Sequence, residues 1–166
     1  MSGDDIRVIS QIVGGDKTYR HFVRRINKEF KAADEERNSK VFVLYQKDTK
    51  DENVGFAVIG HSPSKMKVWE STFKDEGWVS PVFKMRKPAY ELMYMYIRLE
   101  VRKKGYARRL FRRVVSFTKG NHMEAIYAYV GEESSMALKF YKKRGGKIIK
   151  DLSDETTSNA FLEWRL

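Results

Sequence analysis

Hydrophobic positions follow two periods along this chain, and each period predicts a different kind of element. Consecutive or alternating apolar residues, many of them β-branched or aromatic, predict strands. These strands cover residues 6–13, 41–46, 54–60, 92–99, 125–130, 147–150 and 160–166, with a further short one at 67–73. Apolar residues at helical spacing predict helices over 19–33, 107–118 and 134–144. Strands and helices that alternate in this way indicate a mixed α/β fold.

The stretch from Glu91 to Gly120 joins a predicted strand to a predicted helix through a short basic turn, Arg102-Lys103-Lys104-Gly105-Tyr106-Ala107. Gly105 lets the backbone approach a ligand closely, and the free N–H groups and positive dipole end of a helix N-terminus attract phosphate. Lys119 and Gly120 are expected to close the helix, the glycine as its C′ residue. The pattern predicts a site for a phosphate-bearing ligand, with a solvated basic turn as the alternative.

Two motifs resemble those of the GNAT superfamily of N-acetyltransferases. The first is Arg102-x-x-Gly105-x-Ala107 after a strand, which is similar to the R/Q-x-x-G-x-G/A signature of that family. The second lies between Val130 and Gly146 and matches the family pattern at Val130, Ala137, Phe140, Tyr141 and Gly145. It departs from the pattern at Ser134, where Asn is usual, and at Gly146, where Phe is usual.

The resemblance implies a mostly antiparallel sheet of six to seven strands flanked by helices. A splay between the fourth and fifth strands would form the cleft for acetyl-CoA, the expected co-substrate, and no metal is expected. In the family the basic turn wraps the coenzyme pyrophosphate, and backbone groups of the fourth strand contact the pantetheine and thioester. The residues expected to bind the coenzyme are Tyr96, Ile97, Arg102, Lys103, Lys104, Gly105, Tyr106, Ala107, Arg108, Ser134, Ala137 and Tyr141.

The resemblance also implies a reaction, in which an amine attacks the acetyl-CoA thioester directly in a ternary complex. A tyrosine at the position of Tyr141 serves the family as general acid toward the leaving thiolate; packing on the helix face is the alternative. Glu91 is the first candidate for the base, because it lies eleven residues before Arg102. The histone acetyltransferase branch carries its catalytic glutamate at that offset. Glu100 is the second candidate, and a water chain would replace both.

Composition limits the remaining possibilities. The 166 residues suit one domain, 1–166, with 42% hydrophobic residues and a variable insert at about 61–89. Cysteine is absent, the three histidines lack metal-ligand spacing, and neither a signal peptide nor a membrane span is seen. These features predict a cytoplasmic protein that does not bind a membrane. The insert holds Trp69 and Trp78, and it is expected either to line the acceptor side of the cleft or to cover a sheet edge.

The formal net charge of +11 suits an anionic coenzyme, but it also permits nucleic-acid binding through the arginines of the 107–118 helix. Signatures of RRM, KH or helix-turn-helix modules are absent, which argues against nucleic acid. A third alternative is a GNAT-like domain that binds acyl-CoA without turnover. The acceptor, a small amine or a protein or peptide amine, and the oligomeric state, with a homodimer as one option, stay open.

Overall fold

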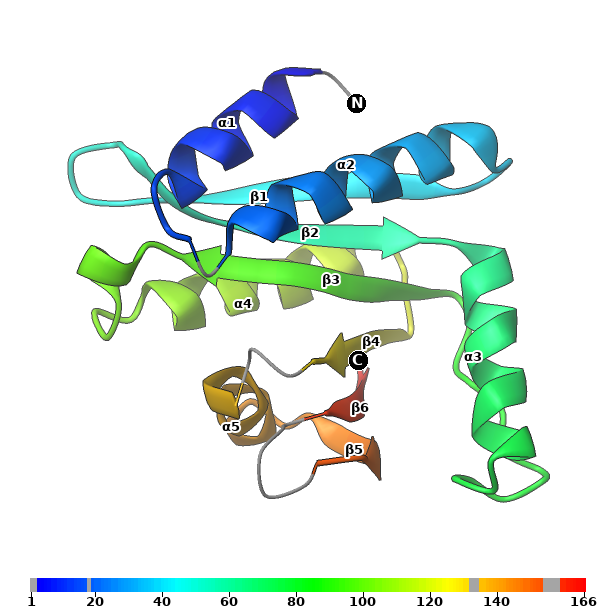
Figure 1. Ribbon diagram of the computed structural model, residues 1–166. Coiled ribbons are helices and arrows are strands. Elements are labelled where there is room, and N and C mark those ends of the chain that lie inside the picture. Colours follow the sequence, from blue (N-terminus) through cyan, green and yellow to red (C-terminus); the bar gives the residue numbers. More distant parts are fainter. Residues whose placement is uncertain (1–2, 18, 132–134, 154–158) are drawn as a thin grey trace. The chain divides into compact units, whose positions relative to one another are not determined.

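The computed structural model describes residues 3–17, 19–131, 135–153 and 159–166 (Figure 1). The helices are α1 (Gly3–Val13), α2 (Arg20–Glu35), α3 (Pro63–Asp75), α4 (Tyr106–Gly120) and α5 (Ser135–Lys143), with a 3-10 turn η1 (Leu99–Val101). The strands are β1 (Lys40–Lys47), β2 (Asn53–His61), β3 (Ala89–Ile97), β4 (Ala125–Val130), β5 (Lys147–Asp151) and β6 (Ala160–Arg165). Their order in the sheet is β1-β2-β3-β4-β6-β5. The predicted fold class, a mixed and mostly antiparallel sheet flanked by helices, is confirmed.

The chain forms two compact units, and each unit is built from two separate stretches. The first unit combines Met1–Ser62 with Leu92–Phe117. Its core brings apolar side chains of α1 and α2 onto β2 and the end of β3, with Ile9, Ile26 and Phe56 completely buried. Figure 1 shows α2 running along β1 and β2, which are paired antiparallel.

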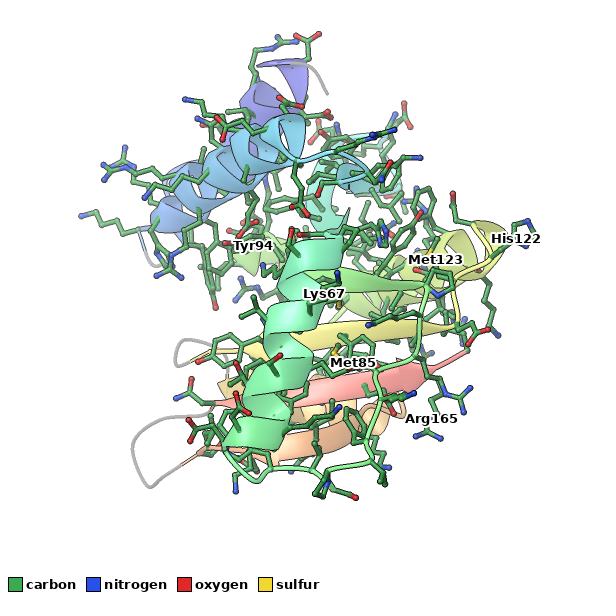
Figure 2. The ribbon with its side chains drawn as sticks, turned by 90° about the vertical axis from the view of Figure 1, so that its right-hand side faces the viewer. Lys67, Met85, Tyr94, His122, Met123 and Arg165 are labelled. Carbon is green, nitrogen blue, oxygen red and sulfur yellow. The ribbon has the colours of Figure 1, made fainter. Side chains whose placement is uncertain are left out.

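The second unit combines Pro63–Glu91 with Thr118–Leu166. The first residues of β3 pair in parallel with β4, and β6 pairs antiparallel with both β4 and β5. One core cluster joins α3 to these strands through Met66, Phe73 and Tyr127. In Figure 2, α3 lies in front of β4, β6 and β5, so this helix covers one face of the strands. Tyr141 of α5 packs against Trp164 of β6.

Residues 6–13, predicted as a strand, belong to helix α1, so the strand prediction was wrong. The stretch is rich in β-branched residues, but its buried side chains Ile9, Ile12 and Val13 follow helical spacing. Asp4 and Asp5 in the first turn also suit the positive end of a helix dipole. Burial of one helical face therefore prevails over intrinsic strand preference.

The second wrong prediction is the short strand at 67–73, because those residues lie in helix α3. Pro63 occupies the first position of that helix, where its fixed backbone angle and missing N–H are tolerated. At the other end Gly77 adopts a φ of 67°, and the N–H of Trp78 bonds to the carbonyl of Phe73, as in a Schellman motif. The insert is thus a capped helix followed by a loop.

Helix α4 was predicted correctly along its buried face, with Leu110, Val114 and Thr118 completely buried. Its end differs from the prediction, because Gly120 lies within the helix. The left-handed residue is His122, with a φ of 61°, and the N–H of Met123 bonds to the carbonyl of Thr118. The predicted strands at 41–46, 54–60, 125–130 and 147–150 are confirmed as β1, β2, β4 and β5. Those at 92–99 and 160–166 are confirmed as β3 and β6 with shifted ends.

Candidate functional site

The basic turn between η1 and α4 has a backbone that a phosphate group could approach. Lys103 and Gly105 adopt left-handed φ angles of 64° and 85°, which bend the chain sharply before the helix. The carbonyl of Gly105 accepts a hydrogen bond from the N–H of Arg109, so this glycine directly precedes the first residue of α4, Tyr106. The side chains of Lys103, Lys104 and Arg108 are exposed. The structure describes every residue in the first turn of α4, and none of them is acidic. The residues present therefore fit an anionic ligand at the helix N-terminus.

Arg102 is turned back toward β3. Its Nε atom donates a hydrogen bond of 2.7 Å to the carbonyl of Ile97. Its guanidinium lies 5.3 Å from the ring centroid of Tyr19 and 5.4 Å from that of Tyr96. Arg102 therefore ties the turn to the end of β3 and to the segment before α2, and part of its hydrogen-bonding capacity is already used.

Tyr96 and Ile97, the strand residues expected to meet the pantetheine, are buried at the end of β3. The Tyr96 hydroxyl donates a hydrogen bond of 2.8 Å to a carboxylate oxygen of Asp16. Helix α2 begins after Tyr19 without a side-chain cap, and Asp16 in the preceding segment holds Tyr96. Of the remaining turn residues, Tyr106 is buried and Ala107 half-buried.

Glu91 lies in the second unit, as the last residue of β3 that pairs with β4. Its side chain is only 7% exposed, and one carboxylate oxygen lies 2.9 Å from Nζ of Lys65 in the first turn of α3. The same row across the sheet continues with Tyr127 of β4 and Glu163 of β6, so these three side chains share a face. Glu100, the second candidate for the base, is exposed in η1.

Tyr141 lies on α5, and its side chain is buried with 7% of its surface exposed. Its ring meets the ring of Trp164 edge-on at 5.3 Å between centroids. Burial raises the pKa of the Tyr141 phenol above its ordinary value, which keeps the hydroxyl protonated at neutral pH. Ala137 is half-buried one turn earlier. Ser134, the remaining predicted coenzyme residue, lies outside the described residues.

Glu91 and Tyr141 approach opposite faces of the strands in their unit. Glu91 shares its face with Glu163, whereas Tyr141 packs against Trp164, the next residue of β6. Successive side chains of a strand point to opposite faces. Glu91 therefore lies on the face of the strands that α3 covers, and Tyr141 lies on the other face, against β6.

A buried polar network lies beside Glu91 and was not predicted from the sequence. The Tyr127 hydroxyl donates a hydrogen bond of 2.7 Å to Glu163 and accepts one of 2.8 Å from the N–H of Arg86. Nε of Arg165 donates to the other Glu163 oxygen at 2.9 Å. A signal was available, because Glu163 interrupts a run of apolar residues in a strand. A carboxylate in such a run needs partners when both sheet faces are covered.

The buried tyrosine of this network predicts a loss of stability in alkali. Burial, followed by the hydrogen bond to Glu163, raises the pKa of Tyr127 above the ordinary value of 10.0. The protonated phenol is thus favoured in the folded state, so its contribution is complete below pH 10 and declines as pH rises toward the folded pKa. Each pH unit in that window costs about 1.4 kcal/mol of unfolding free energy per such group.

Urea denaturation of the wild type and of Tyr127→Phe at about pH 8 and about pH 11 would measure this effect. Phenylalanine should cost about 1–3 kcal/mol at the lower pH, because Glu163 loses a donor. The variant should then lose less stability than the wild type between the two pH values, since lysine titration is common to both. Equal losses in the two proteins would contradict the assignment.

The two tryptophans of the insert pack within the second unit. Trp69 lies edge-on to Phe161 at 5.5 Å between ring centroids, and Trp78 lies 5.9 Å from Phe73. Both belong to the border of the cluster beneath α3. These contacts favour the structural alternative for the two rings, although the role of the insert as a whole toward an acceptor stays a prediction.

Among the described residues, no group of three or more histidine, aspartate or glutamate side chains could hold a metal ion. No helix in the same part of the chain is both long enough and apolar enough to cross a membrane.

Comparison with known proteins supplies the family context for this geometry. The model of the Acetyltransferase (GNAT) family matches residues 10–146. A sequence search found no match among curated proteins. A proposed GNAT-family acetyltransferase from Desulfovibrio desulfuricans has a similar structure, with a TM-score of 0.65 and 12% identity. The alignment covers 99% of this chain and 94% of that one.

Two further similar structures contain coenzyme A. One is the PaiA N-acetyltransferase of Thermoplasma acidophilum in complex with coenzyme A, with a TM-score of 0.61, 14% identity, and coverage of 100% of this chain and 96% of that one. The other comes from a NatC complex bound to Gag peptide and CoA, with a TM-score of 0.54 and 14% identity. That alignment covers 99% of this chain and 92% of the other. At these identities the similarity shows a shared fold.

Proposed function

This chain belongs to the GNAT acetyltransferase family, and from that membership we propose that it transfers the acetyl group of acetyl-CoA to a primary amine. The observation that carries the proposal is the turn before α4, where Gly105 with a φ of 85° opens a helix N-terminus surrounded by exposed cations. This turn lies within the matched residues. The relative crystallised with coenzyme A supports acetyl-CoA as the co-substrate.

The turn would hold the pyrophosphate of the coenzyme through backbone N–H groups at the start of α4. Lys103, Lys104 and Arg108 would add charge-assisted contacts to the phosphates. Arg102, with Nε on the carbonyl of Ile97, would mainly fix the shape of the turn. Main-chain groups near Tyr96 and Ile97 would meet the pantetheine. The assignment of Ser134 and Ala137 to the coenzyme rests on the family motif alone.

The reaction proceeds by direct attack of the amine within a ternary complex. Glu91 takes a proton from the acceptor ammonium, and the neutral nitrogen then attacks the thioester carbonyl carbon. The C–S bond breaks, and Tyr141 gives its phenolic proton to the departing thiolate. The attacking nitrogen loses its second proton through solvent, and this proton restores the phenol, so the products are the amide and coenzyme A thiol. In this assignment the base lies on the side of the entering amine and the acid on the side of the leaving group.

Calorimetry with acetyl-CoA, followed by a free-thiol assay over a panel of amines and short peptides, tests the function. Binding of acetyl-CoA and thiol release that depends on an amine are expected. Binding without release for any amine would favour an acyl-CoA-binding domain without turnover. Absence of binding, together with an affinity for DNA that falls steeply with salt, would favour the nucleic-acid alternative.

The coenzyme site itself can be tested at Gly105. Any side chain there meets the strain of a φ of 85°, although a Cβ atom would touch nothing within 4 Å. Gly105→Gln and Gly105→Glu share this strain and differ in charge. We expect glutamate to weaken acetyl-CoA binding about tenfold to hundredfold more than glutamine, because it repels phosphate. Equal affinities of two folded variants, measured by calorimetry, would move the site elsewhere.

A further inference from the structure

The ion pair between Lys65 and Glu91 joins the helix of the insert to the proposed base. The lysine nitrogen lies 2.9 Å from the carboxylate oxygen, and the lysine side chain is 31% exposed against 7% for the glutamate. Desolvation offsets much of the attraction in a buried ion pair, so the pair is weak support for stability. Glu91 is the last paired residue of the β3–β4 ladder and the proposed base, so the ion pair lies where the proton transfer is proposed.

Nζ of Lys65 lies where the nitrogen of an acceptor amine would have to lie for Glu91 to take its proton. A general base must lie within about 2.6–3.2 Å of the nitrogen from which it takes a proton. Nζ of Lys65 is a primary amine already within that distance of Glu91. The other buried carboxylate on this face, Glu163, is bonded to Tyr127 and Arg165.

We propose that Lys65 is a self-acetylation site, an inference that rests on the proposed acetyltransferase function. Glu91 removes a proton from the Lys65 ammonium and passes it to water. The neutral Nζ attacks the thioester carbonyl carbon of acetyl-CoA, forming a C–N bond as the C–S bond breaks. The second proton of the attacking nitrogen leaves with the thiolate as coenzyme A thiol. Overall, lysine ammonium and acetyl-CoA give acetyl-lysine, coenzyme A thiol and one proton.

Acetylation would change the surroundings of Glu91. The amide is neutral, so the ion pair is lost and the carboxylate becomes available to the ammonium of an incoming acceptor. The modified protein is then the form that processes external amines, and the first turnover of each molecule is spent on Lys65. Transfer to external amines should therefore show a lag that ends as Lys65 becomes acetylated.

Lys67 offers a matched control on the same helix. It lies two residues after Lys65 on an exposed part of α3, and Figure 2 labels it on that helix. Chemical acetylation by the thioester, without catalysis, should favour exposed lysines such as this one. Acetylation that depends on Glu91 should instead favour Lys65, although its side chain is partly covered.

The test incubates the full chain with acetyl-CoA and no acceptor, at several protein concentrations, and maps acetylated lysines by mass spectrometry. The acetylated lysines of the purified protein are mapped before the incubation, because Lys65 can already be modified during expression. An acetyl group present at Lys65 of the wild type and missing from Glu91→Gln is then the expected result. Labelling of Lys65 should exceed that of Lys67 at least about tenfold, and Glu91→Gln should slow it at least about tenfold. The rate constant for labelling of Lys65 should not depend on protein concentration. The Lys67→Arg substitution should leave this rate constant unchanged.

Equal labelling of the two lysines, or a rate constant proportional to protein concentration, would overturn the proposal. The same preparation is assayed for acetyl-CoA binding and for thiol release with amines. If amines are acetylated while Lys65 stays unmodified, the self-acetylation proposal fails and the proposed function stands. If neither binding nor thiol release occurs, the proposed function itself fails.

Discussion

Replacement of Tyr141 by phenylalanine should lower kcat by roughly 10²–10⁴-fold, the usual effect of losing a general acid. Phenylalanine keeps the ring and its contact with Trp164, so the helix should stay in place and acetyl-CoA affinity should change little. Tyr129→Phe is the matched control. It removes a hydroxyl from an exposed tyrosine of the same unit and should leave kcat unchanged.

The pH dependence of kcat gives this prediction a second measurement. Since burial raises the pKa of Tyr141, the phenol stays protonated as pH rises through 10.0. A decline of kcat due to ionisation of Tyr141 should therefore begin above the range of an ordinary tyrosine. If kcat of Tyr141→Phe stays within about twofold of wild type, the residue packs α5 against β6 and the thiolate leaves unaided. An ordinary thiol pKa of about 8.5 would permit that.

Glu91→Gln should have an effect of similar size on kcat, again roughly 10²–10⁴-fold. The loss should be largest at low pH, where the acceptor is protonated and needs a base, and smaller at high pH, where solvent supplies the neutral amine. Acetyl-CoA affinity should stay near wild type. Kinetics over a range of pH with a fixed acceptor measure both effects.

Two controls separate chemistry from folding in this experiment. Glu100→Gln alters the exposed carboxylate of η1 and should leave kcat at wild-type values. Glu91→Gln leaves Lys65 without its buried partner, so urea denaturation should accompany the kinetics. A folded variant with wild-type rates at every pH would assign the deprotonation to a water chain or to another base.

The sequence predicts those parts of the fold in which local pattern and tertiary burial agree. Helix α4 is one example, because Leu110, Val114 and Thr118 follow one helical period and are all buried. Strands β1 and β2 are others. The first helix was predicted as a strand because its β-branched residues favour that structure, whereas the spacing of its buried side chains is helical. The wrong strand prediction within α3 has the same cause, because its valine, tryptophan and threonine also favour strands.

For the candidate site, the sequence identifies single residues better than their partners. The basic turn, Tyr141 and Glu91 follow from motifs that span a few residues each. Lys65 and Glu91 are twenty-six residues apart (91 − 65 = 26) and meet only because α3 folds over the strands. Similarly, Tyr127 and Glu163 face each other because β4 and β6 pair in one register. Such contacts depend on topology, which periodicity along the chain does not encode.

The division of both units into two separate stretches has a consequence for synthesis on the ribosome. The first unit can close once residue 117 has left the exit tunnel, whereas the second must wait for its last strand. β6 lies between β4 and β5 in the sheet, so both strands emerge before the partner that joins them. The nascent chain therefore carries unpaired edges of β4 and β5 until β6 has emerged, and chaperone binding in this interval would protect it against aggregation.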